Sequence, residues 1–102
     1  MNYAFVVFIA GVLLSCGSVN SQSTEIHPGK SVYKMYCIAC HGPDGKLMLN
    51  EAPDLSVSKM TLEERLENIR KGGSMMPAFS EVLSEQQIQD VADYLDELKE
   101  LE

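Results

Sequence analysis

The chain has 102 residues, which is room for one small domain that buries only about 60 to 65 per cent of the surface its unfolded chain exposes. Its formal net charge is −7, and all the acidic residues follow Cys16, so the excess negative charge belongs to the part after that cysteine. A nucleic acid partner is therefore excluded on charge, because phosphate backbones attract basic surfaces.

The N-terminal segment predicts export. The first fifteen residues carry no charged side chain, and Tyr3–Leu14 is an apolar run. This run has the length of a signal-peptide core and is too short to span a bilayer, so we expect residues 1–15 to be a signal peptide. Its end, Leu13-Leu14-Ser15-Cys16, resembles the lipobox of bacterial lipoproteins, although no Lys or Arg precedes the run. The resemblance implies that Cys16 is acylated and becomes the new N-terminus. The alternative is a plain signal peptide, with Cys16 discarded or left free.

A small, polar stretch without periodicity follows. We expect residues 16–28 to form the lipidated cysteine and a flexible tether, and residues 29–102 to form one domain. His27 lies in this tether, where an exposed bystander is a better interpretation than an iron ligand.

The first predicted helix runs from about Lys30 to Ile38 and delivers the most informative motif of the chain. Cys37, Cys40 and His41 spell C-x-x-C-H, the pattern of covalent haem c attachment with an adjoining iron ligand. A redox dithiol or half of a zinc site are the competing interpretations. A redox dithiol usually follows a strand in a βαβ unit, and the sequence near the motif contains no strand-like run. A zinc site would need two more ligands. The chain offers Cys16, His27 and carboxylates for that role.

The three cysteines support a joint interpretation. An odd count in an exported protein leaves one thiol to explain. Here Cys37 and Cys40 take the haem and Cys16 takes the lipid, so we predict no disulfide.

The rest of the chain predicts a loop and two further helices. Residues 47–58 read as a loop around the cofactor. Thr61 with Glu64 forms a capping box that opens a second helix, which ends at Gly72 and Gly73. Ser84 with Gln87 opens a third helix that ends near Leu101. The expected pocket lining is Leu55, Leu66, Ile69, Phe79 and Leu95.

Between these two helices stands a methionine loop, Gly72–Phe79, which contains Met75 and Met76. The glycines allow a close approach, and Pro77 keeps the preceding residue out of helical geometry. A methionine held this way can present its thioether to a haem iron, and a His/Met pair raises the reduction potential. The alternative is that the methionine only fills a gap in the hydrophobic core and does not bind a metal.

Taken together, the C-x-x-C-H motif, Ala52–Leu55, Ile69–Gly72, Met76–Phe79 and Ile88–Leu95 resemble a small class I cytochrome c, similar to cytochromes of the c6 type and to membrane-anchored monohaem lipoproteins. The resemblance implies an all-α cytochrome c fold of three main helices around one covalent haem. It implies that Met76 is the second axial ligand, with Met75 as the alternative, and that the Pro53 carbonyl orients the His41 imidazole. It also implies that Gly29 and Tyr33 meet Tyr94 and Leu95 where the first and last helices cross.

These features predict an electron carrier and not an enzyme. We expect single-electron transfer between respiratory redox partners with basic docking patches, no small-molecule substrate, and a lipid anchor on a bacterial membrane facing the periplasm or the cell exterior. The alternatives are a gas sensor or peroxidase-like domain with a labile methionine, and a dedicated electron-transfer subunit of one oxidoreductase.

Overall fold

The computed structural model describes residues 25–101, together with Gly11, Val12 and Gly17. The predictions for Cys16 and for most of the signal peptide and tether lie outside these residues. The described part contains the helices α1 (Pro28–Tyr36), α2 (Ile38–His41), α3 (Leu62–Lys71) and α4 (Glu85–Leu98), and the 3-10 turns η1 (Leu49–Glu51) and η2 (Leu55–Val57). It contains no β-strand, as the all-α prediction requires, and none of its helices has the length and apolar character needed to cross a bilayer.

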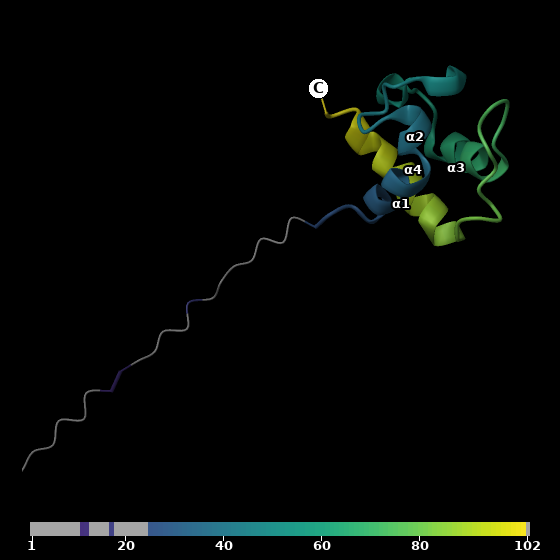
Figure 1. The fold of residues 1–102 in the computed structure, drawn as a ribbon. Helices are drawn as coiled ribbons and strands as arrows, with labels where there is room; N and C mark the ends of the chain where they lie inside the picture. The colour runs from purple at the N-terminus through teal and green to yellow at the C-terminus, as the bar shows by residue number, and fades with distance from the viewer. Residues whose placement is uncertain (1–10, 13–16, 18–24, 102) are drawn as a thin grey trace, which may run out of the picture.

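The helices α1 and α4 cross, as Figure 1 shows, and α3 packs against α4 from another side. A Cβ atom at Gly29 would lie 2.0 Å from the backbone oxygen of Asp90 and 2.7 Å from the Cβ of Tyr94, so only glycine fits there. The rings of Tyr33 and Tyr94 pack with their centroids 5.3 Å apart. The expected meeting of Gly29 and Tyr33 with Tyr94 is therefore confirmed, while Leu95 lies half-buried against the core.

The start of α1 differs from the sequence prediction. Because the His27 Nδ1 accepts a 3.0 Å hydrogen bond from the Gly29 N–H, and because Pro28 suits the first helical position, the helix begins at Pro28 and not near Lys30. The His27 ring also packs on Tyr94, with centroids 5.6 Å apart. The interpretation of His27 as an exposed bystander was wrong, since it is the N-cap of α1.

The two later helices begin as predicted. Both expected capping boxes form, Thr61 with Glu64 at α3 and Ser84 with Gln87 at α4. Gly72 ends α3, whereas α4 ends at Leu98 and not near Leu101.

One charged side chain is buried between α3 and α4. Arg65 is only 6% exposed, and its Nη2 atom donates to Asp96 Oδ1 at 2.7 Å while Nη1 donates to the Ala92 carbonyl at 3.2 Å. Its Nε atom has no hydrogen-bond partner among the described residues. Nothing in the sequence pattern distinguished Arg65 from the exposed charges of the same helix.

Candidate haem site

The C-x-x-C-H motif lies where α1 ends and α2 begins. Cys37 stands at the break between the two helices, and Cys40 and His41 complete the single turn of α2. Both thiols are half-buried and free. Burial raises the pKa of Cys37 to about 11, so a free thiol here is protonated near neutral pH. Redox-active dithiols need the opposite shift, which argues against the dithiol interpretation.

The His41 imidazole is suited to metal ligation. The residue is only 8% exposed, and burial lowers its pKa, which favours the neutral ring that a metal ion requires. The Pro53 carbonyl lies near enough to raise this pKa in part, although the buried Nδ1 atom makes no hydrogen bond of acceptable geometry. A metal-bound histidine usually donates its second ring N–H to a carbonyl, which fixes the ring orientation. His41 Nδ1, buried and without a partner near the Pro53 carbonyl, is placed to form such a bond.

The chain after His41 is held by hydrogen bonds on both sides. The buried Tyr33 hydroxyl donates to the Gly42 carbonyl at 2.5 Å, and Leu47 N donates to the His41 carbonyl at 3.0 Å. These bonds tie the motif to α1 and to the following loop, so the imidazole sits on a braced segment.

The loop that carries Pro53 is braced as well. Asp54 Oδ1 accepts hydrogen bonds from Ser56 N at 2.9 Å and from Ser56 Oγ at 2.6 Å, and Leu55 N donates to the Gly45 carbonyl at 2.9 Å. The Pro53 carbonyl is therefore presented on a defined turn and not on a loose loop.

Met76 stands in a closed turn at the end of α3. Gly73 N donates to the Met76 carbonyl at 3.0 Å, and Met76 N donates to the Gly73 carbonyl at 2.7 Å. At Gly72, where φ is +65°, an added Cβ would lie 2.5 Å from the Met76 carbonyl oxygen. Met76 is half-buried and packs on the core, whereas Met75 is 65% exposed. The structure thus distinguishes the two methionines by burial.

The residues expected to line the pocket belong to one apolar cluster. Leu66, Ile69 and Phe79 are buried in the core, and Leu55 and Leu95 pack half-buried against it. The same core also contacts Cys37 and Ile38 of the C-x-x-C-H segment and Met76 of the methionine loop.

The sequence did not point to one contact that the structure shows. Asn68 Nδ2 donates to the Met76 sulfur at 3.7 Å. A single asparagine on an exposed helix face carries no sequence signal for such a role.

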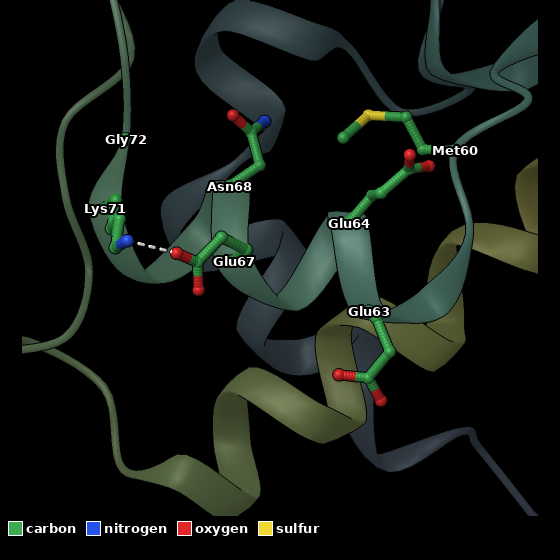
Figure 2. A pocket seen from close by; sticks show the side chains of 7 residues that line it. All are labelled: Met60, Glu63, Glu64, Glu67, Asn68, Lys71 and Gly72. Carbon is green, nitrogen blue, oxygen red and sulfur yellow. Dashed lines mark ion pairs between the residues drawn. The ribbon is translucent and has the colours of Figure 1, made fainter.

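An open groove of about 550 Å³ follows the exposed face of α3 beside the methionine loop. Figure 2 shows the side chains that line it, Met60, Glu63, Glu64, Glu67, Asn68, Lys71 and Gly72. Lys71 pairs with Glu67 within the groove, so its remaining charge is acidic.

The donor set fits haem c. Two free thiols share one helical turn, a buried imidazole follows them, and a half-buried thioether stands on another loop against the same apolar core. Within residues 25–101, no three His, Cys, Asp or Glu side chains come together as an alternative metal-binding group.

Comparison with known proteins defines the class. Residues 24–95 match the family described as cytochrome c oxidase, cbb3-type, subunit III, and the chain belongs to this family of c-type cytochromes. It is a small class I c-type cytochrome, which implies one covalently bound haem c. The class comprises electron carriers and not enzymes.

More particularly, its curated relatives are cytochromes c6. The chain is 34% identical over 79 residues to cytochrome c6 of Petalonia fascia, covering 70% of this chain and 89% of that protein. It is 30% identical over 97 residues to the chloroplastic cytochrome c6 of Chlamydomonas reinhardtii, covering 84% of this chain but only 63% of that longer protein.

A solved structure confirms the cytochrome c fold. The KustC0563 c-type cytochrome matches with a TM-score of 0.61 and 25% identity, over 69% of this chain and 95% of that one.

Proposed function

We propose that this protein is a membrane-tethered, single-haem electron carrier whose iron is held between His41 and Met76. The observation that carries the proposal is the contrast within the methionine loop, where Met76 packs against the same apolar core as Cys37 while Met75 is 65% exposed. If His41 and Met76 both stayed in place, a change in the oxidation state of the iron would need little rearrangement of the site, which suits one-electron transfer.

Each residue of the site has a defined task in this proposal. Haem c would supply an iron that alternates between the ferrous and ferric states. Cys37 and Cys40 would hold the group covalently, and His41, whose pKa is lowered by burial, would offer one neutral ring nitrogen to the metal. The Pro53 carbonyl, which lies near the His41 ring, would accept from the other ring nitrogen and set the ring orientation when the group is bound. Met76 presents a soft sulfur that favours ferrous iron.

The side chains expected to line the pocket would keep water away from the metal. Leu66, Ile69 and Phe79 are buried, and Leu55 and Leu95 pack against them half-buried. A dry, low-dielectric site disfavours the ferric state, which carries the larger charge, and therefore supports a high potential.

The ligand assignment is tested by a matched pair of variants, Met76→Ala and Met75→Ala, in protein matured with haem c. The ferric wild type should show the weak far-red band of a sulfur–iron bond. Met76→Ala should lose this band, lower the potential and let the ferrous protein bind carbon monoxide quickly. Met75→Ala should keep all three properties, because its side chain is exposed. The opposite pattern would assign the ligand to Met75, and rapid carbon monoxide binding by the wild type would favour the sensor interpretation.

We also propose that residues 1–15 are a signal peptide and that acylation of Cys16 tethers residues 29–102 to a membrane, facing the periplasm or cell exterior. The support is the apolar run and the lipobox-like end of the sequence. Several acyl chains, at about 0.8 kcal/mol per buried methylene, would anchor the protein firmly. Cys16→Ser should release haem-loaded protein from membranes or block its processing. Full membrane retention of a processed Cys16→Ser protein would contradict the anchor.

The proposed redox partners are respiratory proteins with basic docking patches. The net charge of −7 and the acidic groove on α3 support this choice, since complementary charge speeds encounter. The electron-transfer rate with such a partner should fall steeply as ionic strength rises. A rate independent of salt would contradict electrostatic docking.

A dedicated subunit of one oxidoreductase is the second candidate, favoured by the matched family's description as an oxidase subunit. Co-purification with one complex after mild detergent extraction would support it, whereas recovery as a free protein would support the shuttle.

A further inference from the structure

We propose that Arg70 and Glu85 are positioning residues for Met76. Their ion pair joins the end of α3 to the start of α4 and so closes the connection of residues 72–84, which carries the methionine loop. The inference rests on the proposed function, in which Met76 ligates the iron, and it adds a salt-sensitive control over how readily the sulfur leaves.

The contact between the two side chains is bidentate. Arg70 Nε donates to Glu85 Oε1 at 3.2 Å and to Oε2 at 3.1 Å, and Nη2 donates to Oε2 at 2.9 Å. Paired hydrogen bonds between a guanidinium and a carboxylate are stronger and more directional than a single contact between charges. This geometry is the case in which an ion pair near the surface contributes measurably to stability.

The pair bridges two helix ends. Arg70 lies in the last turn of α3 and Glu85 in the first turn of α4. A helix carries partial negative charge at its C-terminal end and partial positive charge at its N-terminal end, so each side chain has the favourable sign for its own helix. Figure 1 shows the connection between α3 and α4 as a long loop, and the pair therefore fastens this loop at its base.

The backbone of Arg70 holds the same loop. The Arg70 carbonyl accepts a 3.3 Å hydrogen bond from Ser80 N, and the Ile69 carbonyl accepts a 3.0 Å hydrogen bond from Phe79 N. Met76 lies in the stretch that these bonds enclose. When the last turn of α3 separates from residues 79–84, both backbone bonds and the ion pair are lost together, so the pair stabilises the closed loop.

Retention of the sulfur should therefore depend on ionic strength. Arg70 is 33% exposed and Glu85 is 68% exposed, so dissolved ions reach the pair. The screening length falls from about 10 Å at 0.1 M salt to about 3 Å at 1 M. Local opening starts in segments with few buried contacts, and salt that weakens the pair should make this opening of the loop more frequent.

The experiment measures imidazole binding to ferric, haem-loaded, full-chain protein, because imidazole binds the iron only after the sulfur leaves. At low salt, Arg70→Gln and Glu85→Gln should each bind imidazole about threefold more tightly than the wild type, as expected for a well-formed surface pair. The double variant should bind no more tightly than either single variant, because the two changes remove one interaction. Raising the salt to about 1 M should bring the wild type close to the variants, which should themselves change little.

Lys71→Gln is the matched control. It removes a positive charge from the same end of α3, but its ion pair with Glu67 lies within that helix, as Figure 2 shows, and does not span the loop. It should bind imidazole as the wild type does. An equal change in Lys71→Gln, or additive effects in the double variant, would overturn the inference.

Two further outcomes separate this inference from the proposed function. If the wild type shows the far-red band but Arg70→Gln and Glu85→Gln bind imidazole as it does, Met76 ligation stands and the inference fails. A loss of stability towards urea without a change in imidazole binding would likewise mean that the pair only supports the fold. A wild type without the far-red band would remove Met76 ligation, and the inference with it.

Discussion

The hydroxyl of Tyr33 on α1 donates a 2.5 Å hydrogen bond to the carbonyl of Gly42, the residue that follows His41. The Tyr33 side chain is 1% exposed, and burial raises its pKa well above the ordinary value, so that the hydroxyl remains a donor. Because the same ring packs on Tyr94 of α4, this one side chain links the helix crossing to the haem-attachment segment.

Tyr33→Phe should therefore lower the free energy of unfolding of the haem-loaded protein by about 1 kcal/mol. The Gly42 carbonyl also accepts from Gly45 N at 3.3 Å, so it is not left wholly unpaired and the loss stays moderate. Urea denaturation measures the effect, and Tyr36→Phe is the control, since that ring is 38% exposed. Equal losses in the two variants would contradict a specific role for the buried hydroxyl.

The two neighbouring glycines of the methionine loop should respond differently to alanine. Gly72 has φ of +65° and ψ of −165°, a conformation that is nearly restricted to glycine and costs other residues about 1 to 3 kcal/mol, and its added Cβ would press on the Met76 carbonyl oxygen. Gly73 has no atom within 4 Å of an added Cβ. We expect Gly72→Ala to lose at least this much stability and to weaken the far-red band, while Gly73→Ala stays near wild type. Thermal unfolding and the ferric spectrum measure both effects, and similar behaviour of the two variants would refute the argument.

Local signals account for what the sequence predicted well. Capping boxes depend on residues three positions apart, so Thr61 and Ser84 marked the starts of α3 and α4 correctly. Gly72 marked the end of α3 for a similarly local reason, and C-x-x-C-H is a motif within one turn.

The features that the sequence missed depend on contacts between distant segments. Arg65 looks like any charged helix residue until α4 brings the Ala92 carbonyl and Asp96 against it. Asn68 acquires a partner only when the loop folds back. His27 was misjudged because its capping bond requires Pro28 to be helical and its ring partner, Tyr94, is far along the chain.

The corrected role of His27 can be tested directly. His27→Ala removes the acceptor for Gly29 N and the contact with Tyr94, so it should lower the free energy of unfolding by about 1 kcal/mol. His27→Asn keeps a capping acceptor and should recover part of that loss. Urea denaturation at constant pH gives both values, and an unchanged stability of His27→Ala would return the residue to the role of a bystander.

The Arg65–Asp96 contact should make stability depend on acid pH. The pKa of Asp96 is held below its ordinary value, chiefly by the hydrogen bond from Arg65, while partial burial opposes the shift. Because the folded protein binds this proton more weakly than the unfolded chain, the contact stabilises the fold above the ordinary carboxyl pKa of about 4. The contribution is lost as the pH falls through the lower folded-state pKa.

Asp96→Asn should accordingly be less stable than the wild type at pH 7, by about 1 kcal/mol, a value kept small because the Asp96 side chain is 65% exposed and the pair is screened. The difference should narrow as the pH falls below about 4, since the wild-type carboxylate then takes up its proton. Urea unfolding of both proteins from pH 7 to pH 3 measures this convergence. Asp93→Asn serves as the control, because Asp93 accepts only from Gln89 on the same helix. A difference between Asp96→Asn and wild type that stays constant over the whole range would mean that the Asp96 side chain acts on stability by something other than its charge.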